Sequence, residues 1–281
     1  MKDRAYASLQ ALAVGDALGS QFFVPANRAS FEARTLPPGP WQWTDDTEMA
    51  ASIYLVLTRH GAIDQDALAA SFAERHDFDR GYGPSTGRLL RLVREGGDWR
   101  TLAREPFDGA GSWGNGAAMR VAPLGAWFAD DPAEAARQAA LSAEVTHPHP
   151  EAVAGAIAVA VAAAIAPSQP PPGKFIDEIL RLVPPGTVRK GIVDARRLLT
   201  IGDPSTASAV LGNGRHVAAH DTVPFSLWAA ARHLGDYKAA FWTTAAAGGD
   251  VDTTCAIVGG ILGSSPADWL EHCEPLPSWA L

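Results

Sequence analysis

The sequence predicts an all-α protein, and three features of its pattern support this. Apolar residues recur at three- and four-residue spacing along much of the chain, which is the period of one helix face. Alternation of apolar and polar residues, which is typical of half-buried strands, is nearly absent. No two β-branched runs flank a hairpin turn. We therefore expect a compact multi-helix fold.

The helices are expected in the following order. A first helix carries Tyr6, Leu9 and Leu12, and a second ends at Gly61 after Leu57. Further helices are expected at 67–74, 85–95, 132–145, 151–166, 175–182, 191–199, 222–233, 237–246 and 252–262.

One of these helices requires a membrane test. Residues 152–166 are all apolar, counting one glycine, but the run is about 15 residues long and a bilayer needs roughly 20. We expect a helix buried in the protein core and no membrane partner. The proline-rich break at 167–173 could join two domains. Because the chain on both sides is helical and similar in composition, we expect a surface loop within a single domain, 1–281.

Charge and cysteine content exclude several classes of protein. The net charge is −8, from 23 basic and 31 acidic residues, so a broad nucleic-acid-binding surface is not expected. Two cysteines, Cys255 and Cys273, form no CxxC pair, which argues against a disulfide framework or a zinc site of usual spacing. The N-terminus lacks the apolar core of a signal peptide. A reducing cytoplasm is the expected location.

Two acidic motifs lie at expected helix starts near opposite ends of the chain. The first contains Thr44, Asp45 and Asp46, and the second contains Asp250 and Asp252 after two glycines. Each motif alone could be a helix cap or a plain loop. Together they supply four carboxylates and several hydroxyls, which are hard oxygen ligands. Such a set suits Mg²⁺ or Mn²⁺, also accepts Ca²⁺, and argues against zinc.

A glycine-rich stretch and a histidine segment are further candidates. Residues 111–120 (GSWGNGAAMR) combine small residues with the start of a helix, where backbone amides can hold a pyrophosphate. His147 lies in THPHPE, at 146–151. The alternative for the glycine-rich stretch is a tight loop packed under a helix. The alternative for the histidine segment is that its histidines only cap a helix or turn the chain. The polar segment DRGYG at 79–83 is a weaker candidate, and its alternative interpretation is a surface turn without a functional role.

In order along the chain, six segments resemble the ADP-ribosylglycohydrolase family. They are GDALGS (15–20), WTDDTEMA (43–50), DRGYG (79–83), GSWGNGAAMR (111–120), THPHPEAVAGA (146–156) and GGDVDTT (248–254). The resemblance spans nearly the whole chain, and the TDDT and GGDxDT pair is its specific part. It implies an all-α fold with a binuclear Mg²⁺ or Mn²⁺ centre in a cleft.

The resemblance also implies roles for individual residues. The implied metal ligands are Thr44, Asp45, Asp46, Asp250, Asp252 and Thr253, with Asp252 bridging. The implied contacts to ADP-ribose are Gly111, Ser112, Trp113, Gly114 and Asn115 around the pyrophosphate and ribose, Phe107 on adenine, and His147 near the phosphates or the distal ribose. Asp79 is implied to assist at the distal ribose.

The implied reaction is hydrolysis of an ADP-ribosyl linkage. The metals would bind the distal ribose and lower the pKa of a water that attacks the anomeric carbon. Asp45 or Asp46 would orient that water. The sequence does not name the acceptor, so arginine, serine, a base and a small molecule all stay open. We expect a monomer, because no coiled coil or edge strand suggests assembly.

The chain departs from the family pattern at one informative position. Many relatives carry a glutamate four residues after the last glycine of GDALG, and this chain has Phe23 there. The change bears on linkage specificity and favours one alternative, a protein that binds ADP-ribose without cleaving it. A second alternative is a binuclear hydrolase acting on another ADP-ribose derivative, such as a phosphate ester.

Overall fold

The computed structural model describes residues 1–280, and within that range it contains α-helices, short 3₁₀ turns and loops but no strand. The predicted all-α fold is confirmed. The α-helices are α1 (Lys2–Ser20), α2 (Arg28–Ala33), α3 (Asp45–His60), α4 (Gln65–Arg75), α5 (Pro84–Arg94), α6 (Trp99–Arg104), α7 (Gly116–Met119), α8 (Ala122–Trp127), α9 (Pro132–Glu144), α10 (Pro150–Ile165), α11 (Pro172–Leu182), α12 (Thr187–Arg197), α13 (Pro204–Leu211), α14 (Ala219–Arg232), α15 (Tyr237–Ala245), α16 (Val251–Leu262) and α17 (Ala267–Leu270).

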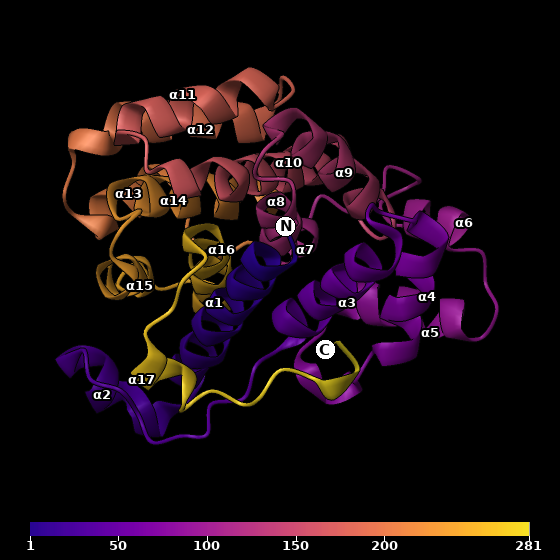
Figure 1. Ribbon diagram of the computed structural model, residues 1–281, viewed down its shortest axis with the longest axis horizontal. Coiled ribbons are helices and arrows are strands. Elements are labelled where there is room, and N and C mark those ends of the chain that lie inside the picture. The colour runs from indigo at the N-terminus through magenta and orange to yellow at the C-terminus, as the bar shows by residue number, and fades with distance from the viewer. Residues whose placement is uncertain (281) are drawn as a thin grey trace.

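Helices from the two ends of the chain pair at the centre of the molecule, where α1 lies beside α16 (Figure 1). Glycines make this contact close. A Cβ on Gly15 would lie 2.2 Å from the carbonyl oxygen of Cys255, and one on Gly19 would lie 2.7 Å from Cα of Asp252. The backbone of α1 therefore lies directly against the first turn of α16, which carries the second acidic motif.

The alanine-rich helix α10 forms the other part of the core, as expected for 152–166. It packs against α7, α8, α9 and α14, and most of its side chains are buried. Small residues again permit close contact, because a Cβ on Gly125 of α8 would lie 2.1 Å from the carbonyl oxygen of Ala160. By length and composition alone, Pro150–Ser168 could cross a bilayer. In this fold its apolar surface is mostly covered by other helices.

The structure differs from the predicted elements mainly in short helices. Helices α2, α6, α7, α8 and α17 are too short to show two turns of a periodic pattern, so the sequence did not predict them. The eight-residue α13 was not predicted either. The break at 167–173 lies in the connection between α10 and α11. Helix α14 begins three residues before the predicted start and continues through Pro224, whose ring packs against Gly191 of α12.

Candidate metal centre and cleft

A cleft of about 440 Å³ is the candidate site, because segments far apart in the sequence meet there. Its wall is formed by the starts of α3 and α16, residues from 81–86 and 112–116, Met119, His147 and Val217. Acidic side chains and a glycine-rich loop therefore share one hollow, as a site for a phosphorylated ligand and cations requires.

The acids of both motifs lie at helix starts. Thr44 is the N-cap of α3, and its hydroxyl accepts a hydrogen bond from the Asp46 amide at 3.4 Å. Asp250 is the N-cap residue of α16, and Asp252 lies in the first turn. Carboxylates are favoured at helix N-termini by the unpaired amides and the helix dipole. The helix starts thus place acids from both ends of the chain in the same cleft.

The acids approach one another closely. Asp16, Asp46 and Asp252 can each place one carboxylate oxygen within 4.8 Å of the other two. Asp46 Oδ1 is buried and has no hydrogen-bond partner among the described residues. A buried carboxylate oxygen without a donor is costly. An oxygen-rich cluster with an unpartnered buried atom fits a divalent cation, which would supply the missing positive charge.

The electrostatics of the cluster lead to the same conclusion. Burial and the neighbouring charges of Asp16 and Asp252 raise the pKa of Asp46 well above its usual range. Burial, Asp250 and Asp16 do the same to the pKa of Asp252. Burial and the charge of Asp16 raise the pKa of Asp45 to about 7. Carboxylates held this close repel one another unless they bind protons or cations.

Asp16 is a site residue that was not among the predicted ligands. It is fully buried on α1, and its Oδ2 accepts hydrogen bonds from the Thr44 and Thr47 amides and the Thr47 hydroxyl. Its Oδ1 lies 2.8 Å from the Thr44 hydroxyl. Burial raises the pKa of Asp16 to about 6, against the opposing effect of these hydrogen bonds. The signal in the sequence was its place in the GDALGS segment, as the one acid in the apolar second half of α1.

A hydrogen-bond relay orients His147. Its Nδ1 lies 2.7 Å from the Thr146 hydroxyl, which also accepts a hydrogen bond from Arg120 at 2.9 Å. Because arginine only donates, the threonine hydrogen is free to be donated to Nδ1, and we assign the other ring nitrogen, Nε2, as the N–H. Burial and the charge of Arg120 lower the pKa of His147 to about 3.

The assigned Nε2–H of His147 lies against the glycine loop. A Cβ on Gly116 would be 2.9 Å from Nε2, and one on Gly114 would be 3.3 Å away. Glycine is therefore required here by the close approach of the imidazole. A neutral imidazole that donates from Nε2 suits an anionic oxygen bound in the cleft.

A loop at 212–218 contributes Val217 to the wall of the cleft, and none of the sequence motifs pointed to it. The Asn115 amide donates to the carbonyl of Val217 at 3.1 Å, and the Asn115 side chain donates to Asp250 Oδ2 at 2.7 Å. A Cβ on Gly214 would lie 2.5 Å from Cβ of Asp250, which explains a glycine with positive φ there. The GNG triplet was the available signal for a tight turn.

The predicted turn at 79–83 lies at the cleft, but Asp79 does not line it. Tyr82 donates to the buried Glu48 at 2.6 Å, and Arg80 bonds to Glu274 through both terminal nitrogens. These contacts fix the segment so that Gly81 lies near Asp45. Asp79 itself is exposed and is not part of the cleft wall.

The predicted adenine-binding aromatic lies at the edge of the site. Phe107 packs against Trp113 with ring centroids 4.1 Å apart, and both rings are partly open to solvent. Ser112, Gly114 and Asn115 line the cleft, whereas Gly111 and the two aromatic rings lie outside its wall. Thr44 is likewise outside the wall, within hydrogen-bond distance of Asp16 and Asp46.

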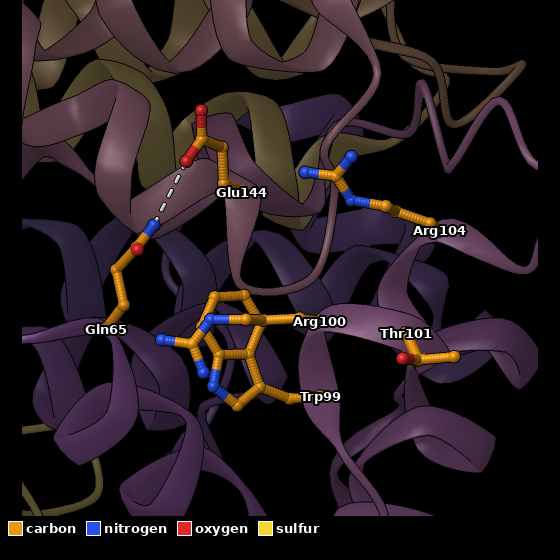
Figure 2. A pocket seen from close by; sticks show the side chains of 6 residues that line it. All are labelled: Gln65, Trp99, Arg100, Thr101, Arg104 and Glu144. Carbon is orange, nitrogen blue, oxygen red and sulfur yellow. Dashed lines mark hydrogen bonds between the residues drawn. The ribbon is translucent and has the colours of Figure 1, made fainter.

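A separate hollow of about 490 Å³ lies between α4, α6 and α9 (Figure 2). Its lining includes Trp99, Arg100, Arg104 and Glu144, with Gln65 bonded to Glu144. Neither the paired acids nor the glycine loop line this hollow, so we assign the candidate site to the acidic cleft.

Comparison with known proteins gives a consistent family. Residues 1–280 match the family model described as ADP-ribosylglycohydrolase. The chain is 29% identical to "ADP-ribosylhydrolase ARH3" of Bos taurus over 273 residues, covering 83% of this chain and 74% of that protein. It is 32% identical to the "ADP-ribosyl-[dinitrogen reductase] glycohydrolase" of Rhodospirillum rubrum over 161 residues, covering 53% and 52%.

A solved structure agrees over nearly the full length. The chain superposes on an "ADP-ribosylglycohydrolase-related protein complex" with a TM-score of 0.71 and 25% identity, covering 97% of this chain and 93% of that one. Sequence and structure comparisons therefore select the same family that the six segments resemble.

Proposed function

The chain belongs to the ADP-ribosylglycohydrolase family, and on this basis we propose that it is a divalent-metal-dependent hydrolase that releases ADP-ribose from an ADP-ribosylated acceptor. The observation that carries the proposal is the acid cluster around Asp46 Oδ1, a buried oxygen without a hydrogen-bond partner. This cluster shares its cleft with the glycine loop and His147.

The metal ligands in this proposal are the two acidic motifs. Asp45, Asp46, Asp250 and Asp252, with the hydroxyls of Thr44 and Thr253, would hold two Mg²⁺ or Mn²⁺ ions, and Asp16 adds a further nearby carboxylate. Divalent ions held there would supply Lewis acidity for a hydrolysis. Asp16 also fixes the start of α3 through its hydrogen bonds to Thr44 and Thr47, so it acts as a positioning residue for the ligands.

The remaining residues bind and orient the substrate. In this proposal the pyrophosphate lies against residues 112–116 and the amides of Gly116 and Ala117 at the start of α7, because the next two amides of this helix already donate to the Asn115 carbonyl. His147 donates from Nε2 to the same group. The distal ribose then reaches the acid cluster at the other end of the cleft.

The bond change is a simple hydrolysis. A water oxygen forms a bond to the anomeric carbon of the distal ribose, and the bond from that carbon to the acceptor breaks. One water proton ends on the acceptor heteroatom and the hydroxyl stays on the sugar. Asp45, whose carboxylate makes no hydrogen bond with any other described residue, is the group that orients the water.

The test is release of free ADP-ribose from arginine-linked and serine-linked ADP-ribosylated proteins in Mg²⁺ or Mn²⁺ and in chelator. The control is the double variant Asp250→Ala/Asp252→Ala. Metal-dependent release by the wild type alone would support the proposal. Metal-dependent binding of ADP-ribose without release from any conjugate would replace it with a binding protein, and release of inorganic phosphate would indicate a phosphatase.

A further inference from the structure

A second hollow, of about 370 Å³, opens from the acidic end of the cleft. Phe23, Asn213, Arg215, Val217 and Asp250 are among the residues that line it. Val217 and Asp250 also line the main cleft, so the two spaces share a wall. We refer to this space as the Phe23 hollow.

The position of the Phe23 hollow relates it to the reacting bond. In the proposed function the glycine loop and His147 hold the pyrophosphate, and the distal ribose lies at the acids. Whatever is attached to that ribose must therefore extend into space that opens beside the acids. The Phe23 hollow adjoins Asp250 itself, whereas the hollow beside Phe78 shares only Pro84 with the main cleft.

Two large apolar side chains on the wall of the Phe23 hollow are unusually exposed, beside the polar residues Asn213, Arg215 and Asp250. Phe23 is 54% exposed and Val217 is 58% exposed, although large apolar side chains are normally covered. Val217 has φ of +53°, an uncommon conformation for a β-branched residue. Its amide and carbonyl are both hydrogen-bonded, to Gly214 and Asn115. The fold thus holds an exposed valine in a strained conformation at the edge of the site, as occurs where a side chain contacts a ligand.

The one cation in the Phe23 hollow has no partner. The Arg215 side chain is exposed, and it makes no hydrogen bond or salt bridge with residues 1–280. The nearby Asp221 is engaged by the backbone of the same loop, accepting from the His216 amide at 2.8 Å. The acid that lines the Phe23 hollow, Asp250, accepts a hydrogen bond from the Asn115 side chain and lies among the acids of the main cleft. Arg215 is therefore free to pair with a charge on a ligand.

We propose that the Phe23 hollow is the acceptor subsite and that it takes an acceptor that is uncharged at the linkage and carries a carboxylate nearby, while it disfavours a guanidinium. The inference rests on the proposed function, since it assigns the leaving-group side of the same reaction. Phe23 and Val217 cover the aliphatic part of the acceptor. Arg215 attracts the carboxylate and repels a second guanidinium.

The test compares two ADP-ribosylated peptides, one linked through serine next to an aspartate and one linked through arginine. If ADP-ribose is released, we would measure kcat/KM for both peptides. In every case we would also measure the dissociation constants of both conjugates and compare them with that of free ADP-ribose. The variants are Arg215→Glu and Phe23→Ala. The matched control is Arg104→Glu, which makes the same charge change at an exposed arginine in the distant hollow of Figure 2.

The wild type is expected to prefer the serine-linked peptide about tenfold or more. Arg215→Glu should change this preference about tenfold, so that it is lost or reversed. Phe23→Ala should weaken the binding of both conjugates, while free ADP-ribose should bind within about twofold of wild type. Arg104→Glu should leave the preference unchanged. If Arg215→Glu leaves the ratio unchanged, or if Phe23→Ala changes free ADP-ribose as much as the conjugates, the subsite assignment is wrong.

The two proposals fail in distinguishable ways. Binding of both conjugates without release would overturn the hydrolase, and the ratio of dissociation constants would still decide the subsite. If ADP-ribose is released but the preference between the two peptides is the same in wild type, Phe23→Ala and Arg215→Glu, the subsite alone is overturned. If neither conjugate binds more tightly than free ADP-ribose and none is cleaved, both are overturned.

Discussion

The acidic end of the cleft and the aromatic pair just beyond its wall, which we call the aromatic end, are built in different ways. At the acidic end, side chains from α1, α3 and α16 converge, and Asp16 and Asp46 are almost completely buried. At the aromatic end, Phe107 and Trp113 lie on a loop and stay partly exposed. Phe107 and Asp108 even have positive φ, which a loop at the surface can accommodate. The acidic end is fixed by helix packing and holds unfavourable charge, whereas the aromatic end is held mainly by local contacts.

This contrast predicts that the largest effects arise at the acidic end. Asp46→Asn should lower ADP-ribose release roughly 1000-fold and abolish tight binding of one metal ion. It should leave the metal-free fold as stable as wild type or more so, because the pKa of Asp46 shows that its charge is disfavoured there. Metal titration by calorimetry and thermal unfolding would test both statements.

The control is Glu271→Gln, which neutralises an exposed carboxylate that makes no hydrogen bond or salt bridge within residues 1–280. It should change neither ADP-ribose release, nor metal binding, nor the stability of the metal-free protein. A metal-free Asp46→Asn protein that is clearly less stable than wild type would mean that the carboxylate has a structural role.

The helix contact beneath the acids gives the next largest effect. Gly15→Ala places a methyl group 2.2 Å from a backbone oxygen of α16, so it should destabilise the fold by about 1–3 kcal/mol or more. Metal affinity should fall as well, since α1 and α16 would separate. Gly202→Ala, which meets only the end of the Arg232 side chain at 3.8 Å, should stay within about 0.5 kcal/mol in urea unfolding. Equal stability of the two variants would contradict the close contact.

The relay behind His147 should have an intermediate effect. Thr146→Val leaves Arg120 and His147 each short of a buried hydrogen bond, which costs about 1–3 kcal/mol of stability. ADP-ribose should bind about tenfold more weakly, and the ¹⁵N shifts of the imidazole should change with the tautomer. Thr146→Ser should restore both. Unchanged ¹⁵N shifts in Thr146→Val would refute the assigned tautomer.

The pH dependence of the metal-free protein should reveal the charge held at the acidic end. The pKa values of Asp16 and Asp45 are raised to about 6 and about 7, so between pH 4 and these values the folded state binds more protons than the unfolded one. Stability is therefore expected to fall as pH rises from 5 to 8, by about 2 °C or more in Tm. Added Mg²⁺ should reduce the fall. A Tm that rises over this range without metal would contradict the assignment.

The aromatic end should give the smallest effect on the fold. Phe107→Ala removes a half-exposed ring, so the free energy of unfolding should change by less than about 0.5 kcal/mol. If the ring stacks on adenine, ADP-ribose affinity should fall several-fold, within the range of about 1–3 kcal/mol for base stacking. Equal affinity of wild type and Phe107→Ala, measured by calorimetry, would remove Phe107 from the site.

The fold class was predictable because helical spacing is a local property. A helix such as α3 shows its period within one segment, and the buried α10 shows as one uninterrupted apolar run. The family was predictable because its motifs are short and ordered, and the match over 1–280 confirms it. The single-domain prediction and the roles of individual site residues stay predictions.

The sequence by itself determined most of the longer helices, the two acidic motifs and the kind of ligand that such oxygens prefer. Only the tertiary structure decided that Asp16 joins the acids, that loop 212–218 contacts both Asn115 and Asp250, and that Asp79 faces solvent. The physical reason is that helix propensity and capping act over a few residues. Close contact between α1 and α16 instead depends on glycines and on packing between segments more than 200 residues apart.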